Sequence, residues 1–240
     1  MMPELREERL VGGYVLAGGR STRMGRDKAL LQLGGEPLVQ HAVRKLRRLT
    51  GEVHILSDRP ELAEFAPLVP DLHPGCGPVS GMEAALAHSR CDWTLVLPVD
   101  MPFLPAILLE RWMRSVVELP KARAALFTVE GLAQAALCLL HRELAPFVRT
   151  AVEQRTFKLY TVFEAAAVEL ALKQGAHVRE VLLNREWDDR AGIALSAGES
   201  GGDPWTLSEA QQRARHLWFA NLNTPEEFAE AERHVDALDT

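Results

Sequence analysis

The chain has 240 residues, of which 47% are apolar and 25% are charged. These are ordinary globular proportions, so they exclude a disordered chain, a coiled coil and a collagen-like repeat, and the length allows one large domain or two small ones. Lys and Arg together number 27 against 33 Asp and Glu, and the formal net charge of −6 argues against a protein that coats nucleic acid or an anionic membrane. An anionic ligand would therefore need a local basic site.

The cysteines indicate reduced thiols. Cys76, Cys91 and Cys138 lie far apart and form no C-x-x-C pair, which disfavours a disulfide framework or a structural zinc site. The first residues lack the basic start and apolar run of a signal peptide, and no stretch reaches the ~18 apolar residues of a membrane span. We therefore expect a cytoplasmic protein that binds neither nucleic acid nor a membrane.

Strands and helices alternate in the first half of the chain. In chain order, the apolar patterns predict a strand at 14–17, a helix from Pro37, a strand at 53–56, a short helix at 60–65, a brief strand at 68–69, a helix at 80–88, a strand at 93–97 and a helix that begins near Leu104. This alternation is typical of an α/β fold with a mostly parallel sheet.

The second half continues the pattern less regularly. It predicts strands at 124–129 and 134–140, helices at 143–152 and 159–172, a strand at 217–220, and a final helix for which Thr224, Pro225 and Glu227 supply the N-cap signals. Residues 188–215, which precede these last elements, contain many glycines and few large apolar residues. We interpret them as an added loop or helical segment within a single domain of residues 1–240.

A glycine-rich loop follows the first predicted strand. Gly18 and Gly19 let backbone N–H groups face an anion without a Cβ in the way. Arg20, Arg23 and Lys28 bring positive charge to the same stretch. The pattern favours binding of a triphosphate, although a polar turn with solvated basic side chains has the same composition. It is neither a Walker A loop nor a G-x-G-x-x-G fingerprint.

Two aspartates follow predicted strands at the sheet edge where open α/β folds bind ligands. Asp100 comes three residues after the strand at 93–97, and a lone carboxylate there suits Mg²⁺, which takes one or two carboxylates together with phosphate oxygens. Asp71 follows the strand at 68–69 and indicates a second loop at this edge. Either carboxylate could instead serve only a turn or a helix N-cap. The sequence contains no H-E-x-x-H and no G-x-S-x-G motif.

Four blocks of this sequence resemble the molybdenum cofactor guanylyltransferase family, which lies within the Rossmann-like nucleotidyltransferases. They are LAGGRSTRMGRDKALLQLGGEPL (16–38), PDLHPGCGPVSGM (70–82), LPVDMPFL (97–104) and FANLNTPEEF (219–228). The Asp27–Lys28 pair and the closing N-L-N-T-P-E-E run favour this branch over cytidylyl- and sugar-phosphate nucleotidyltransferases. The resemblance implies a three-layer Rossmann-like α/β fold with a mostly parallel central sheet.

The resemblance also implies an activity and its residues. The reaction would transfer GMP from GTP to the terminal phosphate of molybdenum-bound molybdopterin, with Mg²⁺ as cofactor, and molybdoenzymes or their chaperones would be partners. Carried over by position, the GTP-binding residues are Leu16, Ala17, Gly18, Gly19, Lys28, Asp71 and Asp100, the molybdopterin-side residues are Asn221 and Asn223, the metal ligand is Asp100, and the catalytic residues are Lys28, Arg23 and Asp100. The acceptor phosphate is already a nucleophile, so in-line attack on the α-phosphorus needs no Ser–His pair.

Three departures from the family pattern leave alternatives open, one being that residues 188–215 are longer than the family needs. At residues 133–136, on the acceptor side of the pocket, this chain differs from the sequence that the family usually has. Residues 56–58 lack the asparagine that the family commonly has near the nucleotide. One alternative is an enzyme of this fold that uses another nucleotide or acceptor, such as CTP with molybdopterin. Another is a non-catalytic nucleotide-binding accessory protein, against which the presence of Lys28 and Asp100 argues.

Overall fold

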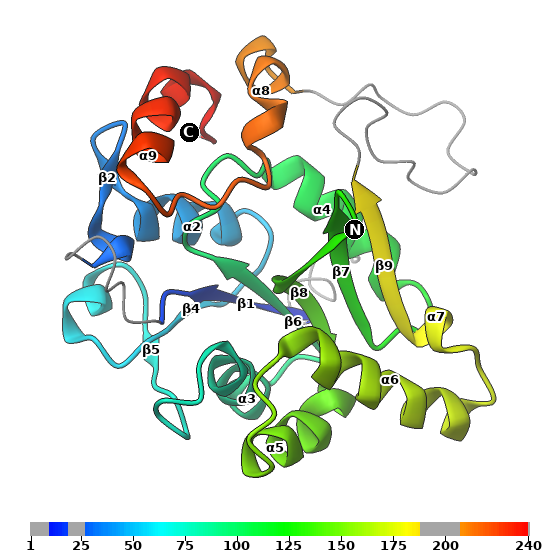
Figure 1. Cartoon of the computed structure of the whole chain (residues 1–240). Coiled ribbons are helices and arrows are strands. Elements are labelled where there is room, and N and C mark those ends of the chain that lie inside the picture. Colours follow the sequence, from blue (N-terminus) through cyan, green and yellow to red (C-terminus); the bar gives the residue numbers. More distant parts are fainter. Residues whose placement is uncertain (1–9, 19–26, 188–206, 240) are drawn as a thin grey trace, which may run out of the picture.

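A seven-stranded sheet forms the centre of the molecule (Figure 1). The computed structural model describes residues 10–18, 27–187 and 207–239. The strand order is β5-β4-β1-β6-β8-β7-β9. The strands are β1 (Val11–Leu16), β4 (Val53–Leu56), β5 (Leu68–Val69), β6 (Trp93–Pro98), β7 (Ala124–Val129), β8 (Leu132–His141) and β9 (Leu182–Trp187). Within this sheet β8 alone runs antiparallel to its neighbours, so the predicted mostly parallel sheet is confirmed.

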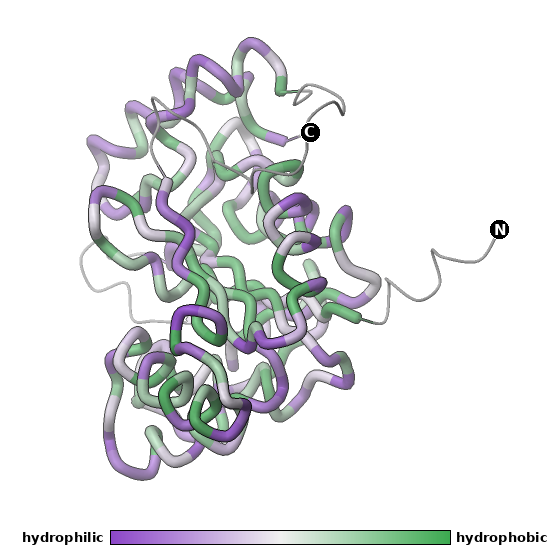
Figure 2. The backbone as a smooth tube through the Cα atoms, turned by 90° about the vertical axis from the view of Figure 1, so that its right-hand side faces the viewer, coloured by the Kyte–Doolittle hydropathy of each residue, from purple (hydrophilic) through white to green (hydrophobic). Residues whose placement is uncertain are grey.

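Helices cover both faces of the sheet. On one face lie α3 (Pro78–His88), α5 (Ala145–Glu153) and α6 (Leu159–Gln174), and on the other lie α2 (Leu38–Arg47), α4 (Ala106–Val117) and the C-terminal elements. The shorter helices are α7 (Val178–Val181), α8 (Glu209–Arg213) and α9 (Pro225–Ala231), with 3₁₀ turns η1 (Lys28–Leu30), η2 (Pro60–Glu64), η3 (Arg142–Leu144), η4 (Arg215–Leu217) and η5 (Glu232–Ala237). The strands at the centre are mostly hydrophobic, whereas hydrophilic residues recur on the outer turns (Figure 2). No helix in the described ranges is long and apolar enough to cross a membrane.

The C-terminal segment departs from the prediction at residues 217–220. These residues form no strand but the end of η4 and the turn after it. Trp218 and Phe219 pack their rings 5.0 and 5.4 Å from the Trp187 ring, and Phe219 also lies 5.0 Å from Phe127. Three consecutive large side chains, Leu217 to Phe219, predict a buried segment correctly, but here burial comes from ring packing and not from strand pairing.

The sequence analysis also missed β9. Asn184, Arg185 and Glu186 occupy the middle of this strand and have low strand propensity. Among the described strands it pairs with β7 alone, so it lies at an edge of the sheet, where polar side chains are common. Of the predicted insertion at 188–215, residues 188–206 lie outside the described ranges, and the remainder contains α8 and begins η4.

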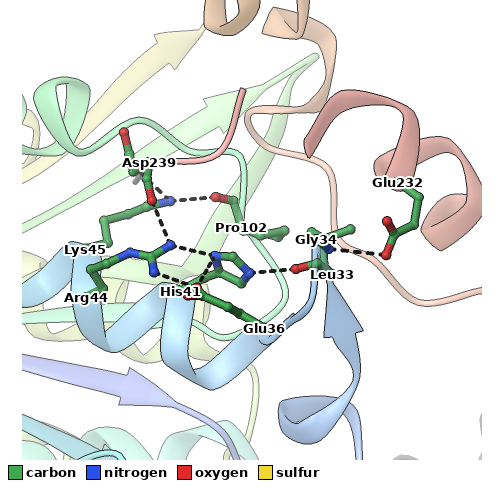
Figure 3. A network of polar contacts seen from close by, with 9 residues as sticks. All are labelled: Leu33, Gly34, Glu36, His41, Arg44, Lys45, Pro102, Glu232 and Asp239. Atoms are coloured by element: carbon green, nitrogen blue, oxygen red, sulfur yellow. Dashed lines mark hydrogen bonds and ion pairs between the residues drawn. The ribbon is translucent and has the colours of Figure 1, made fainter. Parts of the chain in front are cut away.

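A buried network fixes the C-terminal residues against α2 and α4 (Figure 3). Lys45 is 2% exposed, and its Nζ donates to the carbonyl oxygen of Pro102 at 2.8 Å and lies 3.7 Å from Oδ2 of Asp239. The same Oδ2 accepts a hydrogen bond from the backbone N–H of Ala106, the first residue of α4, at 2.8 Å. Burial lowers the pKa of Lys45 to about 8, and the Asp239 charge opposes that shift.

A small hairpin is attached to the same network (Figure 3). Strands β2 (Gln32–Leu33) and β3 (Glu36–Pro37) are joined by Gly34 and Gly35, whose positive φ angles of 60° and 84° suit a tight two-residue turn. The His41 ring on α2 bonds the carbonyl of Leu33 at 2.9 Å, and the N–H of Gly34 donates to Glu232 at 3.3 Å. The hairpin therefore joins α2 to the C-terminal helices.

Candidate functional site

The parallel strands β1, β4, β5 and β6 all end at one edge of the sheet, so the residues that follow them converge there. These segments contain Ala17, Asp58, Asp71 and Asp100. Strand β8 runs in the opposite direction, so its first residues reach the same edge. The 133–136 segment, where the sequence departs from the family pattern, thus lies on the side of this edge formed by β8.

Lys28 joins two distant parts of the chain at this edge. Its Nζ donates to Oδ2 of Asp100 at 2.7 Å and to Oδ1 of Asn223 at 2.6 Å. The side chains of Lys28 and Asp100 are 16% and 20% exposed, so the pair is sheltered but open to a ligand. Three residues singled out in separate sequence blocks therefore meet at one ammonium group.

Local backbone structure holds each of these three residues. Asp27 caps η1 by accepting from the N–H of Ala29 at 2.9 Å, which sets the start of the turn where Lys28 lies. The carbonyl of Asp100 accepts from the N–H of Leu222 at 3.1 Å. The residue next to Leu222 in the chain is Asn223, so the C-terminal segment docks directly on the loop after β6.

The N-terminus of α9 positions Asn223. Thr224 and Glu227 form the predicted capping box: the Thr224 side chain accepts from the N–H of Glu227 at 3.2 Å, and the Glu227 carboxylate accepts from the N–H of Thr224 at 2.8 Å. The same carboxylate accepts from the N–H of Asn223. Asn223 Nδ2 donates to the carbonyl of Asn221 at 3.1 Å, so these two asparagines lie side by side.

Arg59 is a further residue of this edge, and the sequence analysis did not identify it. It follows β4, and its Nη2 donates to the carbonyl of Ala17 at 2.6 Å while its Nη1 forms an ion pair with Asp27. Burial lowers the pKa of the Arg59 guanidinium. Arg59 thus connects the described residues on either side of the glycine-rich segment. A basic residue just after a parallel strand is the one sequence signal that could have indicated it.

Asp71 belongs to an acidic part of the same edge. Burial raises its pKa, and the negative charges of Asp58 and Glu83 raise it further. Glu83 on α3 is 3% exposed and its Oε2 lies 2.7 Å from Nδ1 of His73. Within the described part of the chain, no hydrogen bond or ion pair joins Asp71 to Lys28 or Asp100. Asp71 is thus at the predicted edge but in a different electrostatic environment.

The remaining predicted residues lie at the end of β1 or outside the described ranges. Leu16 ends β1, and its carbonyl accepts from the N–H of Val99 at 3.1 Å, beside Asp100. Ala17 is buried and Gly18 is exposed. Gly19, Arg20 and Arg23 fall within 19–26, outside the described residues.

The Lys28–Asp100–Asn223 cluster fits an anionic ligand held with a hard cation. An ammonium group binds phosphate oxygens as a point charge. Oδ2 of Asp100 is bound to Lys28, and within the described residues Oδ1 has no hydrogen-bond or ion-pair partner. One carboxylate is too few for an all-protein cage, but it suits Mg²⁺ bound jointly by a side chain and substrate phosphates.

Comparison with known proteins identifies sequences similar to this chain. The family model described as "MobA-like NTP transferase domain" matches residues 13–170. A "Molybdenum cofactor guanylyltransferase" of Rhizobium johnstonii is 32% identical over 235 residues, which are 95% of this chain and 94% of that protein. A protein of the same name from Serratia proteamaculans is 35% identical over 164 residues, covering 65% of this chain and 80% of the relative.

Solved structures share the fold. Molybdopterin-guanine dinucleotide biosynthesis protein A from Archaeoglobus fulgidus superposes with a TM-score of 0.65 at 20% identity, covering 92% of this chain and 97% of that one. A putative glucose-1-phosphate thymidylyltransferase from Bacillus anthracis gives a TM-score of 0.67 at 13% identity, with 96% and 97% coverage. At these identities the likeness concerns the fold alone, the Rossmann-like fold that the sequence predicted.

Proposed function

We propose a specific reaction for this chain, which belongs to the family of MobA-like NTP transferases and is a nucleotidyltransferase. It transfers GMP from GTP to the phosphate of molybdenum-bound molybdopterin. The products would be the guanine dinucleotide form of the cofactor and pyrophosphate. The observation that carries this proposal is the contact of the Lys28 ammonium with both Asp100 and Asn223. It supports a role for Lys28 as a phosphate-binding cation between the nucleotide side and the acceptor side inferred from the sequence.

The reaction is an in-line displacement at phosphorus. An oxygen of the molybdopterin phosphate forms a bond to the α-phosphorus of GTP, the bond from that phosphorus to the bridging oxygen of the β-phosphate breaks, and pyrophosphate leaves with the electron pair. No proton has to be removed from the nucleophile, because the acceptor phosphate is already an anion. The protein therefore has to align two anions and neutralise their charge.

Lys28 is suited to that neutralisation. Its charge is balanced by Asp100, with Asn223 as the second acceptor. A triphosphate would compete for the same ammonium, and the proximity of Asn223 would keep Lys28 at the boundary between donor and acceptor. In this proposal Leu16, Ala17, Gly18 and Gly19 line the nucleotide, Arg23 adds positive charge, and Asp71 borders the nucleotide side.

Asp100 is the residue that would hold Mg²⁺. If Lys28 moved toward a bound phosphate, Oδ2 of Asp100 would be released and both carboxylate oxygens could hold a cation. A bound Mg²⁺ would supply charge neutralisation of the phosphate oxygens. The hydrogen bond from Leu222 to the Asp100 carbonyl fixes the backbone at this point, so the carboxylate keeps its position.

The test is pyrophosphate release with each of the four nucleoside triphosphates, with and without molybdenum-loaded molybdopterin, in the presence of Mg²⁺ or of a chelator. We expect release only with GTP, the acceptor and Mg²⁺ together. Asp100→Asn should lower turnover by about 10²- to 10³-fold. Asp92→Asn is the matched control, because Asp92 lies before β6, is 51% exposed and should tolerate the change.

Four results would contradict the proposal. Release with another nucleotide would assign a different donor, and release without molybdopterin would assign a different acceptor. No release with any pair would favour an accessory nucleotide-binding protein. A normal rate for Asp100→Asn would remove Asp100 from the mechanism.

A further inference from the structure

Two histidines and a glutamate meet in the C-terminal part of the chain. His216 lies in η4, Glu230 in α9 and His234 in η5. One possible ligand atom from each of the three residues lies within 4.8 Å of those of the other two. The rings of His216 and His234 are edge to face, with centroids 5.4 Å apart. His216 is exposed, and Glu230 and His234 are half-buried.

The spacing within this group is close to that of a metal site. Zn²⁺ binds imidazole nitrogen and carboxylate oxygen at about 2.0–2.1 Å in tetrahedral geometry, which separates neighbouring ligand atoms by about 3.3 Å. Oε1 of Glu230 lies 3.2 Å from Nε2 of His234, so this pair already has that separation. The candidate ligand atom of His216 lies within 4.8 Å of both, so it would have to come closer to complete a set of three.

The surrounding charges orient the glutamate. Arg233 Nη1 lies 2.7 Å from Oε2 of Glu230, the oxygen that does not face His234. An outer partner of this kind fixes which oxygen is presented to a metal. Arg215 also precedes His216 in the chain, but its guanidinium lies 5.5 Å from the ring centroids of Trp187 and Trp218. Its charge is thus directed at aromatic rings.

We propose that His216, Glu230 and His234 bind a divalent transition-metal ion, with Zn²⁺ the ion best matched to two imidazoles and one carboxylate. The fourth position would be open to water. Mg²⁺ does not suit this set, because it prefers oxygen ligands. The Arg233 charge next to Glu230 leads us to expect moderate affinity rather than that of a zinc finger.

The position of this site gives it a structural consequence. Its ligands come from η4 on one side and from α9 and η5 on the other side of residues 218–224. That segment contains Asn221 and Asn223, the latter bound to Lys28. A metal ion would thus cross-link the two ends of the segment that completes the Lys28 cluster.

The proposal is tested by measuring Zn²⁺ binding to the tag-free full chain after a chelator has removed any bound metal. Isothermal titration should give one Zn²⁺ per chain, Zn²⁺ should raise the Tm by several degrees, and Mg²⁺ at the same concentration should bind elsewhere or not at all. His216→Gln and His234→Gln should each weaken Zn²⁺ binding at least tenfold. The control is His177→Asn, an exposed histidine at the N-cap of α7, where Asn also serves as a cap.

The outcomes separate the metal site from the guanylyltransferase reaction. Equal Tm values of the variants and the parent protein in chelator would show that the fold is kept. Undiminished Zn²⁺ binding by both variants, or no Zn²⁺ binding by the parent protein, would overturn the proposal. Because the readouts are metal binding and Tm, failure of the GTP reaction leaves this test unaffected.

Discussion

Lys28 Nζ and Asn223 Oδ1 are 2.6 Å apart, although 195 positions separate the two residues in the sequence. The contact brings the turn after the glycine-rich segment against the cap of α9. In the proposed reaction this contact keeps the Lys28 ammonium between the nucleotide and the acceptor phosphate. The C-terminal segment therefore contributes to the candidate site as well as covering the core.

Replacing Asn223 by Ala removes one of the two acceptors of the Lys28 ammonium. A hydrogen bond to a charged group contributes about 1.5–3 kcal/mol when sheltered, and this exposed one should contribute near the lower limit. We expect about a tenfold loss in kcat/KM for molybdopterin with a smaller change in the KM for GTP. Steady-state kinetics with each substrate varied in turn measure both values. Asn184→Ala is the control, since Asn184 is exposed on β9; a larger effect on GTP would place Asn223 on the nucleotide side.

Arg59→Met should weaken nucleotide binding without removing a reacting group. Arg59 bonds the Ala17 carbonyl and pairs with Asp27, so its loss frees both flanks of the glycine-rich segment. We expect the GTP dissociation constant to rise about tenfold and kcat to change less, because preorganisation is lost rather than charge at the phosphates. Arg47→Met is a matched control, since Arg47 also donates to a backbone carbonyl, that of Phe65, but at an exposed site on α2. Unchanged GTP affinity would limit Arg59 to a structural role.

Lys45→Met should reveal a pH-dependent stability. The pKa of Lys45 is about 8 in the folded protein against 10.5 for an ordinary lysine. Between these values the unfolded chain holds a proton that the folded chain has lost, so the free energy of unfolding rises with pH. Relative to Lys45→Met, the native protein should gain on the order of 3 kcal/mol from pH 8 to 10.5 and nothing below pH 7. Urea unfolding across this range measures the difference, and a constant difference would contradict the prediction.

Asp239→Asn removes the carboxylate that faces the buried Lys45. A buried ion pair that loses one partner typically costs 3–5 kcal/mol, and we expect a loss of about 3 kcal/mol at pH 7. The loss in the free energy of unfolding should be smaller above pH 8, where Lys45 is neutral. It should also be smaller when Asp239→Asn is introduced into the Lys45→Met variant. Asp236→Asn is the control, because Asp236 lies in η5 just before Asp239, is 61% exposed and pairs with Arg213 at the surface. An equal loss of unfolding free energy in Asp239→Asn and Asp236→Asn would show that the Lys45–Asp239 pair stabilises the fold no more than a surface pair does.

The sequence predicted the part of the site that depends on strand ends. Lys28 and Asp100 lie where a glycine-rich loop and a buried strand meet the carboxyl edge, and the capping signals after Asn223 predicted α9. These features follow from local patterns: apolar runs, glycines and N-cap residues are read over a few positions.

The contacts that were missed depend on packing between distant elements. Arg59 reaches Ala17 and Asp27 only because β1 and β4 are paired. The Trp187 ring packs against the turn at residues 217–220. Trp187 belongs to β9, an edge strand that the sequence analysis missed because its central residues are polar. Local propensity cannot distinguish a buried strand from a buried turn when both need large apolar side chains.

The docking of residue 222 on the carbonyl of Asp100 also bears on the order of events during synthesis. All seven strands of the sheet emerge from the ribosome before Asn223 does. A growing chain can thus form the sheet and expose the Lys28–Asp100 pair while the third member of the cluster is still missing. In the proposed reaction, donor and acceptor phosphates would therefore meet at a complete cluster only after the C-terminal segment has been made and has docked.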